Sequence, residues 1–444
     1  MRDVVITLLV FCSLPYIFKR PSIGMVMWIW ISVMNPHTQG WGFAREFPFA
    51  AIIAVTTVAA MATNAHRKYR YPLTPVTVTF LLFIAYMCLT AAFAIHPELI
   101  LPQLTKVLKI MGMTIVVMML LRKRIHVEWL IWTVVVSIGF YGVKGGIFTL
   151  RSGGQYRVWG PIGTFIDGNN EIALALVMTI PLMLYLYTLL ANKWAKRAMI
   201  LSMLLCALAS LASYSRGAAI AMVAMLTFLW LKSRNKAMLG VLLILCVPVA
   251  LVFMPEQWHA RIDTINEYED DMSAMGRINA WWMAYHLAND RPLGGGFEIY
   301  DAQVFQLYAP IPEDVHAAHS IYFQVLGEHG WGGLAIYLLL GILTWLTGSR
   351  IISRSARFDE LAWAGNLARM VQVSLLGFAV GGAFLSLTYF DVPYYLMAAM
   401  VATHLIVERD RKTLMPKPII NPLAPEPDMP DEKTPEEELR HETA

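Results

Sequence analysis

Three residues in polar stretches between apolar segments have side chains suited to transfer chemistry on an anionic substrate. Arg216 stands in a Ser-Tyr-Ser-Arg-Gly turn with almost no loop, Arg277 follows a glycine in a longer polar stretch, and His319 directly precedes another apolar segment. Guanidinium groups bind phosphate oxygens through two parallel hydrogen bonds. An imidazole, whose pKa lies near neutral, can take a proton from a hydroxyl. The pattern indicates a site that binds pyrophosphate and activates an acceptor hydroxyl.

Five further polar side chains lie where they could contribute to such a site. They are Lys106, Lys109, Arg157, His316 and Glu328. An ionised side chain in the hydrocarbon costs about 3 kcal/mol on insertion scales, so it usually faces a cavity or a partner. The two lysines are three residues apart and share one helix face, and the two histidines of the His-Ala-Ala-His stretch also share a face. We therefore expect these five residues to provide substrate contacts.

A plainer interpretation stays open for each of these side chains. The lysines could extend to lipid headgroups, the arginines could be solvated or paired with nearby carboxylates, and the histidines could be structural. Glu328 follows His319 by nine residues, which is about 180° around a continuous helix. It could orient His319 only if the helix broke at Gly327, and it could instead brace another helix.

The composition argues against a soluble enzyme. Of the 444 residues, 57% are hydrophobic and 15% are charged, whereas a soluble domain has about 25% charged residues. The net charge of +4 is small and unevenly placed, so nucleic acid is not an expected partner. The four cysteines all lie in apolar stretches, which favours packing roles over disulfides or metal ligands. We expect neither a metal nor a cofactor.

Apolar segments of the kind that form membrane-spanning helices recur along the chain. They cover residues 4–18, 22–35, 47–63, 75–95, 99–121, 127–149, 169–191, 197–214, 217–231, 236–254, 320–348, 366–388 and 392–407. The first is short and contains Pro15, so 12 crossings are as defensible as 13. Clusters of three Lys or Arg residues on every second connection mark those connections as cytoplasmic. This places the C-terminus inside, and the N-terminus inside with 12 crossings or outside with 13.

The expected fold is an all-α polytopic membrane bundle with 12–13 transmembrane helices and one long, partly helical external loop. Its parts are transmembrane helices at 1–254, the loop domain at 255–318, C-terminal transmembrane helices at 319–412 and a disordered cytoplasmic tail at 413–444. Within the loop, apolar residues at helical spacing predict a helix from Ser273 to Asn289. Pro292 and the glycines Gly294–Gly296 are expected to end it.

The order of these motifs resembles the O-antigen ligase and O-antigen polymerase superfamily over roughly residues 165–390. The shared features are the Ser-Arg-Gly turn at Arg216, the Gly-Arg pair at Arg277 with a tryptophan after it, the Arg-Pro-Leu-Gly-Gly-Gly-Phe stretch from Arg291, and His319 through Gly330. The N-terminal Asn-Pro-His at Asn35 and Trp-Gly-Phe-Ala at Trp41 resemble a branch known as O-glycosylation ligases. One departure is Ser320, since many members have asparagine after the histidine.

The resemblance implies a glycosyltransferase of the bacterial inner membrane with a periplasmic active site. Such enzymes transfer O-antigen glycan from undecaprenyl pyrophosphate to a hydroxyl of the lipid A-core, without a nucleotide sugar, metal or cofactor. The family's two arginines match Arg216 and Arg277, and its histidine matches His319. The arginines would stabilise the leaving pyrophosphate and the histidine would activate the acceptor in an inverting step, with the two lysines and Arg157 as secondary contacts.

Other functions stay open at this point. An O-antigen polymerase or a protein O-oligosaccharyltransferase would use the same donor with a different acceptor. A different class is a transporter of lipid-linked glycans, but secondary transporters usually show internal repeats and bind their substrates near the membrane midplane. The sequence has no visible repeat, and its unusual polar residues gather at the outer ends of the apolar segments. These features favour an enzyme.

Overall fold

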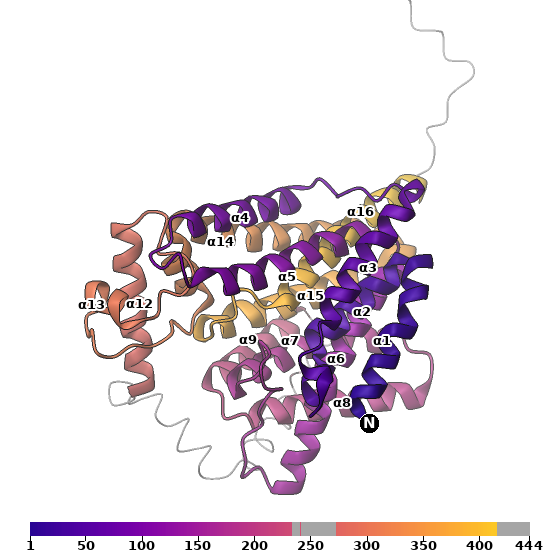
Figure 1. Cartoon of the computed structure of the whole chain (residues 1–444). Helices are drawn as coiled ribbons and strands as arrows, with labels where there is room; N and C mark the ends of the chain where they lie inside the picture. The colour runs from indigo at the N-terminus through magenta and orange to yellow at the C-terminus, as the bar shows by residue number, and fades with distance from the viewer. Residues whose placement is uncertain (233–239, 241–271, 415–444) are drawn as a thin grey trace, which may run out of the picture. The chain divides into compact units, whose positions relative to one another are not determined.

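In the computed structural model, residues 1–232, 240 and 272–414 are described, and every regular element within them is a helix (Figure 1). The α-helices are α1 (Arg2–Lys19), α2 (Pro21–Met34), α3 (Phe49–Thr63), α4 (Pro75–Ala92), α5 (Ile100–Leu120), α6 (Arg124–Ser152), α7 (Asn169–Leu189), α8 (Lys193–Leu211), α9 (Arg216–Lys232), α12 (Met272–Asp290), α13 (Ala302–Tyr308), α14 (Ile321–Ser355), α15 (Ala362–Gly381) and α16 (Asp391–Leu414). The chain divides into two compact units, Met1–Val407 and Glu408–Ala444, and the residues discussed below lie in the first. The all-α class expected from the sequence is confirmed.

The expected apolar segments agree closely with the observed helices. All but one overlap a helix, nine of them with both ends within about four residues, whereas the expected C-terminal ends of α14, α15 and α16 are each seven residues off. The loop helix expected from Ser273 to Asn289 is α12, Met272–Asp290. The remaining segment, 236–254, lies outside the described residues apart from Gly240. The expected tail at 413–444 lies outside them beyond Leu414.

The protein is a multi-pass membrane protein. Seven helices among the described residues are long and apolar enough to cross a membrane, namely α4, α5, α6, α7, α8, α14 and the stretch Asp359–Phe384 that contains α15. Three further apolar helices, Pro21–Met34, Phe49–Thr63 and Arg216–Leu231, have fewer than 18 residues. This is one reason why the expected number of 12 or 13 is larger. The orientation in the membrane stays a prediction.

α7 and α15 pack against each other at the centre of the bundle. The side chains of α7 from Ile172 to Thr179 are all buried, as expected of a helix that is apolar on every face. Ser374 Oγ on α15 donates a hydrogen bond of 2.7 Å to the Met178 carbonyl, and a Cβ at Gly381 would lie 2.5 Å from Leu174. A Cβ at Gly381 would also lie 3.0 Å from Ala221 of α9, so the first turns of α7 and α9 and the end of α15 lie near one another.

α14 is interrupted by a loop that packs into it. Its backbone leaves the helical region at Gly330, where φ is 64° and ψ is −171°. The Pro292 carbonyl oxygen lies 2.1 Å from where a Cβ of Gly330 would be, so a larger residue does not fit. The amides of Gly295 and Gly296 donate hydrogen bonds of 2.9 and 2.8 Å to the carbonyls of Gly327 and Glu328. The glycine-rich stretch that follows α12 thus satisfies carbonyls that the break exposes.

Candidate active site

The turn between α8 and α9 fixes Arg216 at the first residue of α9. Tyr214 has a positive φ of 62°, and its hydroxyl donates a hydrogen bond of 2.7 Å to the Gly154 carbonyl. Ser215 Oγ accepts a hydrogen bond of 3.1 Å from the Ala218 amide, which is the usual side-chain cap of a helix N-terminus. Because the two residues before Arg216 are held by these bonds, the arginine has a defined backbone position.

Arg216 and Arg277 line the same small pocket, although they come from different helices. The pocket has a volume of about 20 Å³. Its lining residues are Asn170, Tyr214, Ser215, Arg216, Gly217, Arg277, Phe384 and Leu385, and we call it the arginine pocket. Both guanidinium-bearing side chains are partly buried. Two cations of the kind that binds phosphate thus share one recess at the ends of membrane helices.

The start of α7 forms another wall of this pocket. Asn169 Nδ2 donates a hydrogen bond of 2.7 Å to the Ser213 carbonyl, which ties α7 to the arginine turn. Glu171, in the first turn of α7, interacts electrostatically with Arg277. A carboxylate therefore balances part of the positive charge of the pocket and can hold Arg277 in place before an anionic substrate binds.

α12 carries Arg277 and also holds the segment that contains both histidines. Asn279 Nδ2 donates hydrogen bonds to the carbonyls of Ile311 (2.8 Å) and Asp314 (2.9 Å). Trp281 Nε1 donates one of 2.7 Å to the Ala318 carbonyl. These contacts hold the chain between residues 311 and 318 against the helix that presents the arginine.

His316 packs directly beside Arg277. A Cβ at Gly276 would lie 2.5 Å from the imidazole of His316, so the residue before Arg277 must be small. His316 Nδ1 also lies 3.1 Å from Asp314 Oδ1. The Gly-Arg pair seen in the sequence is explained by this close packing of an imidazole on the helix backbone.

His319 has a backbone conformation that is unusual for its residue type. Its φ is 41°, and its amide donates a hydrogen bond of 3.1 Å to Ser386 Oγ. Burial, followed by the positive charge of Arg277 and then by His316, lowers the pKa of His319 to about 4. The imidazole is therefore neutral at physiological pH and can accept a proton.

The segment after α15 connects His319 with the arginine pocket. Phe384 and Leu385 line that pocket, Ser386 contacts the backbone of His319, and Thr388 Oγ1 donates a hydrogen bond of 3.1 Å to the Ile321 carbonyl. Ser386 and Asn170 are not among the residues expected from the sequence. Asn169 and Asn170, two polar residues at the start of an apolar segment, are a sequence signal that could have indicated Asn170. No sequence feature indicates Ser386.

Arg157 lies beside the arginine turn but is not part of the pocket lining. Its guanidinium carbon is 5.6 Å from the centroid of the Tyr214 ring, and the side chain is exposed. It is therefore adjacent to the residue that precedes Ser215 and Arg216, at the edge of the candidate site.

Lys106 and Lys109 line a different hollow, with a volume of about 570 Å³. We call it the lysine hollow, and its walls include Trp28, Ser32, Asn35, Lys106, Lys109, Phe165 and Asp391. Lys106 Nζ lies 4.0 Å from the centroid of the Phe165 ring. The two lysines are therefore not part of the pocket lined by Arg216 and Arg277, although the sequence suggests one shared site.

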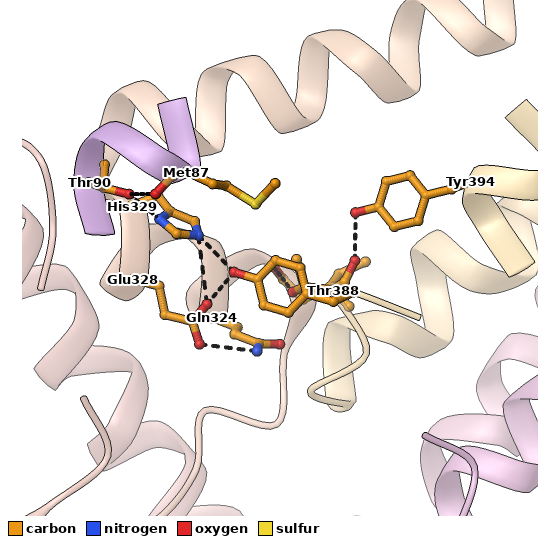
Figure 2. Close-up of polar contacts among 9 residues, drawn as sticks. Met87, Thr90, Gln324, Glu328, His329, Thr388 and Tyr394 are labelled. Carbon is orange, nitrogen blue, oxygen red and sulfur yellow. Dashed lines mark hydrogen bonds and ion pairs between the residues drawn. The ribbon is translucent and has the colours of Figure 1, made fainter. Parts of the chain in front are cut away.

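Glu328 belongs to a buried polar network within the bundle, as Figure 2 shows. It accepts a hydrogen bond from the Tyr389 hydroxyl and one of 3.2 Å from Gln324 Nε2. His329 Nε2 is hydrogen-bonded to the same tyrosine hydroxyl at 2.7 Å, and His329 Nδ1 to Thr90 Oγ1 at 2.7 Å. The helix breaks at Gly330 and not at Gly327. Glu328 therefore bonds within α14 and to the segment after α15 rather than to His319, and His329 connects the network to α4.

Two protein families match parts of the chain. Residues 200–338 match the O-antigen ligase family, and residues 1–191 match a family of unknown function, DUF5935. No curated protein matches the chain. The O-antigen ligase match contains Arg216, Arg277 and His319. The chain is therefore a membrane protein with an O-antigen ligase family domain at residues 200–338, preceded by a DUF5935 region at residues 1–191.

Proposed function

We propose that the protein is an O-antigen ligase that transfers a glycan from undecaprenyl pyrophosphate to a hydroxyl of the lipid A-core. At the level of the family, the domain at residues 200–338 implies a membrane enzyme that acts on lipid-linked glycans. The observation that carries the finer proposal is that Arg216 and Arg277 line one pocket. His319 is close enough to Arg277 for its charge to lower the pKa of the imidazole.

In the proposed reaction, the two arginines act on the leaving group. The bond between the anomeric carbon and the pyrophosphate oxygen breaks, and the negative charge that develops on this oxygen is stabilised most by cations already in place. A pocket of about 20 Å³ admits roughly one water-sized group. It would therefore hold phosphate oxygens at its mouth and leave the sugar and the polyprenyl chain outside.

His319 acts on the acceptor in the same step. Its neutral imidazole takes the proton of the acceptor hydroxyl as the oxygen forms the new bond to the anomeric carbon, on the face opposite the pyrophosphate. The anomeric configuration is therefore inverted, and the proton passes from His319 to solvent. The charge stabilisation and the proton transfer are both supplied by side chains, so the proposed step requires no metal or cofactor.

The proposed location is the bacterial inner membrane, with the active site on the periplasmic side and the C-terminus in the cytoplasm. The arginine pocket lies at the starts of α7 and α9 and beyond the end of α15. The basic clusters at Lys193–Arg197 and Arg350–Arg357 lie at the opposite ends of these helices. By the positive-inside rule these clusters face the cytoplasm, which supports a pocket on the other side.

Deletion of the gene, followed by analysis of the cell envelope, tests the proposed acceptor. We expect lipid A-core without O-antigen. Lipid A-core capped with a single repeat unit would indicate a polymerase, and normal lipopolysaccharide with loss of protein glycans would indicate a protein transferase. A reconstituted protein that moves lipid-linked glycan across a bilayer without forming a glycosidic bond would contradict the enzyme proposal and support a transporter.

A further inference from the structure

We infer that the DUF5935 region builds a second binding site, the lysine hollow, for a saccharide that carries phosphate or carboxylate groups on the acceptor side of the reaction. This inference rests on the proposed function, because it assigns the hollow to the acceptor. In the described part of the chain, every residue that lines the hollow lies within residues 1–191 except Asp391. The arginine pocket is instead lined mainly by residues after 213.

The side chains of the lysine hollow suit an anionic sugar. Lys106 and Lys109 are both exposed and lie one helix turn apart on α5, so two ammonium groups face one space. Ammonium groups make strong charge-assisted hydrogen bonds to phosphate and carboxylate oxygens. Ser32 and Asn35 add hydroxyl and amide groups that can bond sugar hydroxyls.

A buried carboxylate network forms the back of the hollow. Asp391 is only 3% exposed and lines the hollow together with the lysines. The Tyr395 hydroxyl donates a hydrogen bond of 3.4 Å to Asp391 Oδ2, and Trp28 Nε1 donates one of 2.8 Å to the Tyr395 hydroxyl. One buried negative charge thus opposes two exposed positive charges, which leaves a net attraction for an anion.

The two recesses differ in volume, and this difference indicates which substrate group each one can hold. The lysine hollow, at about 570 Å³, falls in the usual range for sites that enclose small organic ligands. The arginine pocket, at about 20 Å³, does not hold a sugar. Arginine also binds phosphate with a fixed two-pronged geometry, whereas lysine acts as a point charge. The pyrophosphate of the donor therefore belongs at the arginines, and the larger hollow remains for a saccharide.

The two recesses are close enough to serve one reaction. Phe165 lines the lysine hollow and Asn170 lines the arginine pocket, and five residues of chain span at most about 18 Å. Leu385 lines the arginine pocket and Asp391 lines the lysine hollow, and the six residues of chain between them span at most about 22 Å. An acceptor held in the hollow by its anionic groups can therefore present a hydroxyl to a sugar at the arginine pocket.

Binding to purified full-length protein in nanodiscs tests the inference. The probe is phosphorylated lipid A-core, with phosphatase-treated lipid A-core for comparison, and the variant is the double substitution Lys106→Gln, Lys109→Gln. Two charge-assisted contacts are lost, so the dissociation constant of the phosphorylated probe should rise about tenfold or more. The constants for the phosphatase-treated probe and for undecaprenyl pyrophosphate should stay unchanged.

Lys144→Gln is the matched control, because Lys144 is an exposed lysine of a membrane helix that lines a separate hollow on α6. It should bind all probes as the wild type does. The inference is overturned if the wild-type protein does not prefer the phosphorylated probe, or if the control loses as much affinity for it as the double variant does. It is also overturned if the double variant loses affinity for undecaprenyl pyrophosphate and keeps its affinity for the phosphorylated probe. Binding requires no turnover, so failure of the proposed transfer would appear separately, as wild-type protein that forms no glycosidic bond.

Discussion

The arginine pocket and the Glu328–His329 network both consist of ionisable side chains near helix ends or breaks, but the side chains of the pocket line a recess and those of the network are buried. In the pocket, Arg216 and Arg277 are partly buried and line a recess. In the network, Glu328 is 4% exposed and His329 is not exposed, and both are hydrogen-bonded to Tyr389. The comparison teaches that a polar side chain near the end of a membrane helix indicates function only when a substrate can reach it.

The backbone decides which of the two roles each residue has. Arg216 begins a helix after a turn held by side-chain contacts, so its side chain lies at a helix end. Glu328 lies just before the break at Gly330, where the Gly294–Gly296 loop covers the helix backbone. Glu328 and His329 are buried, so we expect the network to stabilise the fold and the pocket to perform the chemistry. The predictions below test this division.

The largest effect is expected for the arginines. Arg216→Ala and Arg277→Ala should each reduce kcat by about 10²–10³-fold, since each removes one preorganised charge contact to the leaving group. Arg216→Lys should recover only part of the rate, because an ammonium does not reproduce the two-pronged geometry. Steady-state transfer assays in nanodiscs measure this. Near-normal transfer by either alanine variant would refute the role of that residue, provided that its thermal midpoint matches the wild type.

Glu328→Ala should act on stability instead of chemistry. It removes the carboxylate that accepts the hydrogen bonds of Tyr389 and Gln324, which costs about 1–3 kcal/mol, and the thermal midpoint should fall by several degrees. The folded fraction should transfer glycan at a rate close to that of the wild type. Glu328→Gln, which keeps the shape and one acceptor oxygen, is the control and should lower the thermal midpoint less. A strong loss of kcat at an unchanged thermal midpoint would place Glu328 in the reaction.

Ser386→Ala should lower the rate moderately. The loss of one hydrogen bond to the amide of His319 amounts to about 1 kcal/mol, so kcat should fall roughly fivefold while KM for the donor stays constant. Ser386→Thr keeps the hydroxyl and should restore the rate. If threonine fails to rescue the alanine variant, the hydroxyl is not what positions His319.

The smallest effect concerns pH. Because the pKa of His319 is lowered to about 4, the imidazole stays neutral well below pH 6.5. The acid limb of kcat/KM, which reports groups of the free enzyme, should therefore lie below roughly pH 5. His316→Gln removes the smallest of the three causes that lower the pKa of His319, so the acid limb should move to a slightly higher pH. A wild-type limb near pH 6.5 would show that His319 is not the titrating base or is not buried.

Local patterns were sufficient to predict the helices and the arginine turn. The apolar segments and the loop helix from Ser273 to Asn289 were found because their length and spacing are properties of consecutive residues. The separation of the lysines from the arginines could not be predicted, because it depends on how α5 packs against α2 and the loop at Phe165. The contact of Ser386 with His319 joins residues far apart in the chain, and no local pattern signals it.

A cryo-EM structure of the protein with undecaprenyl pyrophosphate-linked glycan bound tests the central claim most directly. We expect phosphate density between the guanidinium groups of Arg216 and Arg277, with the imidazole of His319 on the far side of the first sugar from the pyrophosphate. Phosphate density in the lysine hollow, or at any position that contacts neither arginine, would contradict it.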